Sequence, residues 1–169
     1  MSSKDIKVGL LAYGAIGDEH SRAVHATSGL SIYAVCDTNP ERLTAALQIS
    51  PGAKTFADAD LMLAEGEIDL VVISTPPNSH YKWAKQALSL GLHVMLEKPM
   101  ALTTQECDEL MELAKKNGAL LVVYQNRRYD ADYLTIKHLI ETDQIGDLFH
   151  YESFVGGYSK PCSYWHSDA

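Results

Sequence analysis

The chain has 169 residues, a formal net charge of −8 and a hydrophobic content of 46%. The length suits one domain, or one domain with part of a second, and the composition is that of an ordinary soluble globular protein. The acidic balance argues against nucleic acid and anionic membranes as partners, and apolar runs of about five residues are too short to span a bilayer.

Short runs rich in β-branched residues alternate with helical patterns along the first 124 residues. The runs are Ile6–Leu11, Ile32–Cys36, Leu70–Ser74, His93–Leu96 and Leu120–Tyr124. Their apolar residues do not alternate strictly with polar ones, which suits strands buried on both faces of a parallel sheet. Strands that alternate with helices form βαβ units. The sequence therefore predicts an α/β fold with a doubly wound parallel sheet.

Several of the helices between these strands have marked ends. Asn39 and Pro40 predict an N-cap followed by proline at the first helical position. Thr103 and Glu106 predict a capping box, and Gly118 ends the helix that they start. Two helices carry apolar residues at the spacing of one buried face. These are Cys107, Leu110, Met111 and Ala114 in one helix, and Trp83, Ala84, Ala87 and Leu88 in the helix that starts near Asn78.

The pattern changes after Tyr124. Residues 129–142 predict one more helix, Gln144-Ile145-Gly146 a break, and Leu148–Val155 a strand with no helix after it. We therefore divide the chain into residues 1–125 and residues 126–169, the latter being a connecting helix and the start of an incomplete α+β domain. Unpaired strand edges recruit partners. We expect Leu148–Val155 to pair with a second copy of the chain, to be disordered, or to belong to a longer protein.

A glycine-containing turn follows the first predicted strand. It reads Ala12-Tyr13-Gly14-Ala15-Ile16-Gly17, a G-x-G-x-x-G pattern with alanine in the first position. In such a turn backbone N–H groups approach a pyrophosphate, and the positive end of the next helix completes the site. Gly14 would let the phosphate approach, and Gly17 would let the helix pack on the strand. A plain strand-to-helix turn also fits, and Ala12 stands where glycine normally serves the turn.

Asp37 ends the second predicted strand, 20 residues after Gly17. An acid at this place accepts hydrogen bonds from the adenosine ribose hydroxyls and repels a 2′-phosphate, which favours NAD over NADP. Arg42, one turn into the next helix, would instead favour that phosphate, so NADP stays possible as the cofactor. The alternative is that Asp37 only caps the helix that starts at Asn39-Pro40.

Polar residues also follow two later strands. Thr75-Pro76-Pro77-Asn78 leads into a helix whose first turn holds His80, at the sheet edge where open α/β folds bind ligands. Taken alone, a plain turn with a solvated His80 is the simpler interpretation. Glu97-Lys98-Pro99 places two charges at the end of a buried strand, where desolvation is costly. Such a cost is expected where charge does chemistry, although a surface ion pair fits the spacing equally well.

Together these segments resemble the Gfo/Idh/MocA oxidoreductases, a family that includes glucose-fructose oxidoreductase and inositol dehydrogenase. Glu97-Lys98-Pro99 is the most specific shared motif, and the resemblance covers nearly the whole chain, including the break at Gln144-Ile145-Gly146. It implies a Rossmann domain that binds NAD, with NADP also open. It also implies hydride transfer between the nicotinamide and a carbon of a sugar, cyclitol or related polyol substrate.

The resemblance further implies the roles of individual residues. Lys98 would be catalytic, touching both the substrate hydroxyl and the cofactor. The residues of the glycine-containing turn would bind the cofactor, together with Asp37, Arg42, Thr75, Pro76, Asn78, His80, Glu97, Lys98 and Gln125. Asn126 and Arg127 would join Gln125 in facing the active-site cleft. The family's second domain supplies an Asp and a His that this chain lacks, so we expect a truncated member that binds dinucleotide and is inactive alone.

Other classes of protein fit less of the sequence. A non-catalytic dinucleotide-binding module, sensing redox state or regulating a partner, would use Gly14 and Asp37 but not Lys98. A methyltransferase also has a glycine-rich first turn, but gives Lys98 no role. The seven histidines show no ligand spacing, so no metal is expected. The three dispersed cysteines indicate a reducing cytoplasm, with Cys36 a small buried hydrophobe rather than a nucleophile.

Overall fold

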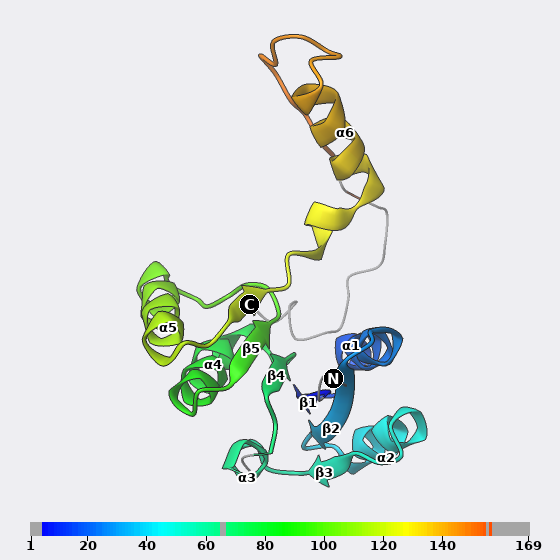
Figure 1. Cartoon of the computed structure of the whole chain (residues 1–169), viewed down its shortest axis with the longest axis vertical. Coiled ribbons are helices and arrows are strands. Elements are labelled where there is room, and N and C mark those ends of the chain that lie inside the picture. The colour runs from blue at the N-terminus through cyan, green and yellow to red at the C-terminus, as the bar shows by residue number, and fades with distance from the viewer. Residues whose placement is uncertain (1–4, 65–66, 155, 157–169) are drawn as a thin grey trace. The chain divides into compact units, whose positions relative to one another are not determined.

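The computed structural model describes residues 5–64, 67–154 and 156. The chain divides into two units, Met1–Tyr124 and Gln125–Ala169. The first unit holds one sheet of six parallel strands in the order β3-β2-β1-β4-β5-β6 (Figure 1). The strands are β1 (Ile6–Leu11), β2 (Leu30–Cys36), β3 (Lys54–Phe56), β4 (Leu70–Ile73), β5 (His93–Leu96) and β6 (Leu121–Val123). This is the predicted doubly wound sheet, and its strand order reverses between β1 and β4.

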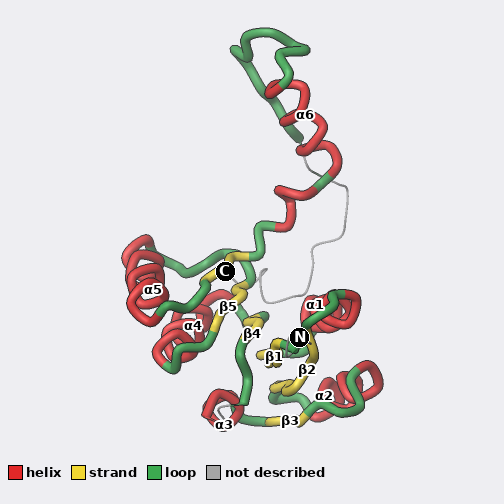
Figure 2. The backbone as a smooth tube through the Cα atoms, viewed as in Figure 1, coloured by secondary structure: helices red, strands yellow, loops and turns green. Residues whose placement is uncertain are grey.

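Helices cover both faces of this sheet, as Figure 2 shows with the strands in yellow between two groups of red helices. On one face α1 (Ala15–Ala26) and α2 (Pro40–Ile49) pack over a core that includes Val8, Leu10 and Val35. On the other, α3 (Ala59–Ala64), α4 (His80–Ser89) and α5 (Thr104–Asn117) pack over Val71, Ile73 and Leu96. Burial on both faces explains why the strands read as apolar runs.

The predicted helix ends are confirmed by hydrogen bonds. The Asn39 side chain accepts from the Glu41 N–H at 2.8 Å, and Thr103 caps α5 through a complete capping box with Glu106. Gly118 ends α5 at a φ of 64°, a conformation that glycine adopts without strain. The buried face of α5 is narrower than predicted, because Leu110 and Ala114 are buried but Met111 is 52% exposed.

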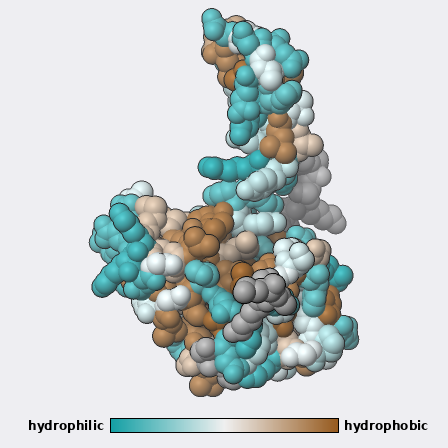
Figure 3. All heavy atoms as spheres, viewed as in Figure 1, coloured by the Kyte–Doolittle hydropathy of each residue, from teal (hydrophilic) through white to brown (hydrophobic). Residues whose placement is uncertain are grey.

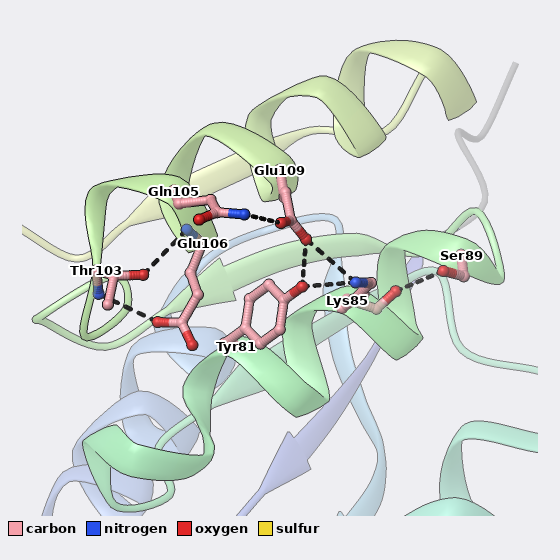
Figure 4. A network of polar contacts seen from close by, with 7 residues as sticks. All are labelled: Tyr81, Lys85, Ser89, Thr103, Gln105, Glu106 and Glu109. Atoms are coloured by element: carbon pink, nitrogen blue, oxygen red, sulfur yellow. Dashed lines mark hydrogen bonds and ion pairs between the residues drawn. The ribbon is translucent and has the colours of Figure 1, made fainter.

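A polar network joins the neighbouring helices α4 and α5 (Figure 4). Glu109 of α5 accepts from the Tyr81 hydroxyl of α4, from the Lys85 ammonium at 3.2 Å and from the Gln105 amide at 3.3 Å. Lys85 and Glu109 are about half exposed. Exposed ion pairs contribute little to stability, so we assign this network to aligning the two helices rather than to the candidate site.

Two elements at one edge of the sheet were not predicted. They are β3, which has only three residues, and the six-residue helix α3. The sequence of β3, Lys-Thr-Phe, contains no apolar run because its first two residues are exposed at the sheet edge. Tertiary pairing with β2, rather than local pattern, makes this segment a strand.

The second unit holds a predicted helix and lacks a predicted strand. Helix α6 (Ala131–Glu141) lies within the range expected from the sequence, and Gly146 has a φ of 64° at the expected break. Residues 148–154 form no strand, so the prediction of Leu148–Val155 is wrong over its described part. A strand needs a neighbour for its backbone hydrogen bonds, and the described residues supply none there. Pairing of two copies through this segment stays a prediction, and Val155 and residues 157–169 lie outside the described residues.

The second unit also exposes large apolar side chains. Phe149 is 98% exposed, Phe154 88% and Tyr129 80%, and Figure 3 shows hydrophobic surface on this unit among hydrophilic atoms. In the part of the chain that the structure describes, no helix is both long and apolar enough to cross a membrane.

Candidate functional site

A cavity of about 490 Å³ opens at the carboxyl ends of β1, β2 and β4. This is where the strand order reverses, and open α/β sheets bind ligands at such a point. The cavity is lined by residues that the sequence singled out from three separate strand ends, namely Ala12, Asp37, Arg42, Thr75 and Pro76. The side chain of Trp83 adds an aromatic wall.

The turn after β1 leaves the N-terminus of α1 open. Gly14 is the N-cap of α1, and a Cβ added there would meet no heavy atom within 4 Å, so the approach to the helix N-terminus is open. A Cβ on Gly17 would lie 2.5 Å from the carbonyl oxygen of Ala12, so only glycine lets α1 pack this close to the turn. Ala12 adopts the left-handed conformation, with φ at 75°. The departure from glycine is therefore accommodated, at a cost in strain.

The side chains of the other residues in this turn do not line the cavity. Ala15 and Ile16 are exposed at the start of α1. Tyr13 is buried, and its hydroxyl donates to Asp18 at 3.1 Å. Burial, together with the hydrogen bond and the charge of Asp18, raises the pKa of Tyr13 above its ordinary value. The Tyr13 side chain thus belongs to the packing under α1.

Asp37 both shapes the turn and lines the cavity. It is 5% exposed, and its two carboxylate oxygens accept from the Tyr13 N–H at 2.7 Å and the Asn39 N–H at 2.8 Å. The Arg42 guanidinium lies 3.4 Å from the oxygen that Tyr13 uses. The two interpretations of Asp37, as a local cap and as a cavity residue, are therefore compatible.

His80 is buried, so a solvated His80 is wrong. It is 1% exposed at the start of α4. Its Nδ1 lies 2.7 Å from the carbonyl oxygen of Pro99, and its Nε2 lies 2.8 Å from that of Thr75. The imidazole therefore connects the loop after β4 to the loop after β5. Asn78 lies in the short 3-10 turn Pro77–Ser79 before it, and is exposed.

Glu97 pairs with a histidine and not with its neighbour on the surface. It is 8% exposed, and its Oε1 accepts from His20 Nε2 at 2.9 Å. Burial alone would raise the pKa of Glu97, but the hydrogen bond and charge of His20, with the Lys98 N–H and ammonium, outweigh it and hold that pKa below its ordinary value. The surface ion pair of Glu97 with Lys98 is therefore wrong. Lys98 itself is exposed, at the carboxyl edge of the sheet.

Sequence reasoning missed His20. It lies on the inward face of α1, 5% exposed, and its ring meets that of Tyr124 edge-on, with centroids 4.7 Å apart. A signal was present, because Gly17, His20, Ser21 and Val24 recur at the spacing of one buried helix face. A histidine on such a face needs a buried polar partner, and Glu97 supplies it.

Three of the predicted residues belong to the second unit. Gln125 and Asn126 belong to the second unit, at the start of the 3-10 turn Asn126–Tyr129, and Arg127 pairs there with Asp130 at 2.9 Å. Their contact with the cofactor or the cleft stays a prediction. Among the described residues, no three His, Cys, Asp or Glu side chains are grouped so as to hold a metal ion. Cys36 is buried, and burial with the charges of Asp37 and Asp58 raises its thiol pKa to about 11.

Comparison with known proteins agrees with this geometry. Residues 6–125 match the family described as "Oxidoreductase family, NAD-binding Rossmann fold", GFO_IDH_MocA. The chain belongs to the Gfo/Idh/MocA family. Its first unit is therefore the NAD-binding Rossmann domain of that family, and the resemblance inferred from the sequence motifs is confirmed.

Individual relatives match the Gfo/Idh/MocA chain over part of their length. An oxidoreductase of Schizosaccharomyces pombe is 47% identical over 62% of this chain and 28% of its own. A scyllo-inositol 2-dehydrogenase (NADP(+)) of Bacillus subtilis is 33% identical over 87% of this chain and 40% of its own. A dehydrogenase of Chromobacterium violaceum, solved in complex with NADH and UDP-GlcNAcA, superposes with a TM-score of 0.78 at 30% identity, over 86% of this chain and 42% of its own. The chain thus spans well under half the length of these relatives.

Proposed function

We propose that this chain forms the cofactor-binding part of an oxidoreductase that transfers a hydride between NAD and a carbon of a sugar, cyclitol or related hydroxyl compound. The observation that carries the proposal is the environment of Lys98. An exposed ammonium stands at the carboxyl edge of β5, directly after a buried carboxylate that is hydrogen-bonded to His20. Burying Glu97 in this way is costly, and the cost is understandable if Lys98 works at this edge.

These positions support the following reaction. A bound NAD⁺ would supply the acceptor for the hydride: the C–H bond of the substrate carbinol would break, its C=O bond would form, and the hydroxyl proton would pass to solvent. The Lys98 ammonium donates a hydrogen bond to the substrate oxygen and stabilises the negative charge that develops there. Within the described residues the Lys98 side chain has no hydrogen bond or ion pair that would compete with this contact.

The remaining residues of the site bind and orient the dinucleotide. Gly14 and the N-terminus of α1 receive the pyrophosphate, and Asp37 receives the adenosine ribose. We propose NAD as the preferred form, because the cavity wall holds three carboxylates, Asp37, Asp58 and Asp60, against one guanidinium, Arg42. That charge balance disfavours the additional phosphate of NADP.

Fluorescence titration of the chain with NADH and, separately, with NADPH tests this proposal. We expect saturable NADH binding and weaker NADPH binding. Absence of binding by either would contradict the proposal. Steady oxidation of a polyol by the 169-residue chain alone would contradict the expectation that it lacks part of the catalytic group.

The alternative is a non-catalytic dinucleotide-binding module. It uses the same turn and Asp37, and it gives Lys98 no contact with the nicotinamide. The Lys98→Ala variant separates the two, because only the catalytic proposal expects it to weaken NADH binding relative to that of ADP-ribose, which lacks the nicotinamide. A sugar or cyclitol as substrate and a cytoplasmic location stay predictions.

A further inference from the structure

We propose that two buried histidines, His20 and His80, hold the Glu97–Pro99 turn from both sides and thereby fix the backbone that carries Lys98. They come from α1 and α4, helices on opposite faces of the sheet (Figure 1). Both are positioning residues rather than catalytic ones. The inference rests on the proposed function only for what Lys98 does, not for how it is held.

The first contact is with the residue before Lys98. His20 Nε2 donates to Glu97 Oε1 at 2.9 Å, although the two residues are 77 positions apart. The other oxygen of the same carboxylate accepts the backbone N–H of Lys98 at 3.3 Å. Because one oxygen is held by α1, the other is held in place for the Lys98 backbone. The ring of Tyr124, edge-on to that of His20, also restricts the imidazole.

The second contact is with the residue after Lys98. His80 Nδ1 lies 2.7 Å from the Pro99 carbonyl oxygen, and Nε2 lies 2.8 Å from that of Thr75. Carbonyl oxygens only accept, so a ring nitrogen of His80 that carries a hydrogen donates to the carbonyl oxygen beside it. One side chain thus lies against both the loop after β4, which lines the cavity, and the loop that carries Lys98.

These contacts hold the backbone on both sides of Lys98 and leave its side chain exposed. Glu97 and Pro99 are both held, whereas the Lys98 side chain between them is exposed. His20 also lies on the helix whose N-terminus is open to a pyrophosphate, one turn beyond Gly17. The same helix would therefore hold the dinucleotide and, through His20, the turn that carries Lys98. Such shared support fixes the position of a reacting group relative to its cofactor.

Amide hydrogen exchange of the 169-residue chain, followed by NMR, tests the first contact directly. The His20→Leu variant removes the hydrogen bond from His20 to the Glu97 carboxylate. We expect the Lys98 amide to exchange on the order of tenfold faster in this variant. The Val94 amide, bonded to the Leu120 carbonyl in the sheet at 2.8 Å, should exchange at the wild-type rate. An equal rise at Lys98 and Val94 would mean global loosening and would overturn the inference, as would no change at Lys98.

Matched variants separate positioning from packing. His20→Gln keeps a donor at the distance of Nε2 and should restore most of the Lys98 protection. His25→Leu removes a histidine from the same helix that bonds to Ser50 instead, and should leave the Lys98 amide unchanged. If His20→Leu does not fold, Glu97→Gln serves in its place, because it keeps the shape of the side chain and removes its charge. Wild-type exchange at Lys98 in that variant would contradict the inference.

The second contact is tested on the His80 ring itself. We expect a ring N–H of His80 that is visible in the ¹⁵N spectrum of the folded chain and protected from exchange with water. A ring N–H that exchanges freely with water would show that His80 is not held between the two loops, and would overturn this half of the inference.

A binding measurement connects the two histidines to function. The ratio of NADH to ADP-ribose affinity should fall in His20→Leu and in His80→Leu, as in Lys98→Ala, because ADP-ribose lacks the nicotinamide. A fall in Lys98→Ala alone would contradict the positioning role of the histidines. An unchanged ratio in Lys98→Ala would instead contradict the proposed function of Lys98, and the exchange experiments would still decide whether the histidines hold its backbone.

Discussion

The backbone N–H of Tyr13 donates to the Asp37 carboxylate at 2.7 Å, which ties the turn after β1 to the end of β2. The same carboxylate also accepts from the Asn39 N–H and lines the cavity. One carboxylate therefore both shapes the turn after β1 and lines the cavity, so under the proposed function the preference between cofactors depends on the local fold. Its removal should therefore be visible in affinity and in selectivity.

Asp37→Asn should weaken NADH binding about tenfold, because a neutral amide is a poorer acceptor than a carboxylate for ribose hydroxyls. It should weaken NADPH binding less, since the charge that repels the 2′-phosphate is gone. The measurement is the pair of dissociation constants by NADH and NADPH fluorescence. Asp69→Asn is the matched control, because Asp69 likewise accepts a backbone N–H, that of Lys7 at 2.8 Å, but at the other end of β1. An unchanged ratio of the two constants in Asp37→Asn would contradict the assignment.

The two glycines of the turn should respond differently to alanine. In Gly17→Ala the new Cβ would lie 2.5 Å from the Ala12 carbonyl oxygen, so α1 must shift, at a cost of about 1–3 kcal/mol in the free energy of unfolding. In Gly14→Ala the Cβ meets nothing within 4 Å and points into the open approach. That variant should lose under about 1 kcal/mol of stability but bind NADH markedly more weakly. Urea unfolding and NADH titration of both variants measure this contrast.

Ala12→Gly should stabilise the chain. Alanine pays for a φ of 75° with steric strain that glycine does not have, and this gain exceeds the entropy that glycine adds to the unfolded chain. We expect an increase of about 1 kcal/mol in the free energy of unfolding, which corresponds to a Tm higher by about 2–4 °C. A lower Tm would show that the Ala12 methyl group contributes packing that outweighs the strain.

Local chemistry explains which parts of the fold were predictable from sequence. The caps at Asn39 and Thr103 and the stop at Gly118 act over three or four residues, and all three are where the sequence places them. β3 was missed because its pairing with β2 is not encoded in its own three residues. The strand predicted at Leu148–Val155 was wrong over its described residues, 148–154, for the converse reason: its apolar pattern suits a strand, but the described residues give it no neighbour.

The candidate site shows the same division. Gly14, Asp37 and Lys98 follow strand ends, and the carboxyl ends of parallel strands meet at one edge, so their grouping was predictable. The partnership of His20 with Glu97 was not, because it joins a helix and a strand end across 77 residues. Burial of His80 was missed because a polar residue in a first helical turn is more often solvated than enclosed between two loops.

Glu97 should make the free energy of unfolding depend on pH in the acidic range. Its pKa in the folded chain is lowered because His20 and Lys98 outweigh the effect of burial, so folding is favoured by the ionised form. That contribution is present above the unfolded pKa of about 4.3 and is lost as the pH falls through the lower folded pKa. Glu97→Gln should therefore be less stable than wild type near pH 7, and the difference should shrink as the pH falls below about 4.

Chemical unfolding of Glu97→Gln and wild type across this pH range measures the difference. Glu67→Gln is the control, because Glu67 forms an exposed pair with Lys54 at 3.1 Å and exposed pairs contribute little to stability. A constant difference between Glu97→Gln and wild type at all pH values would show that the carboxylate charge is not what stabilises this turn.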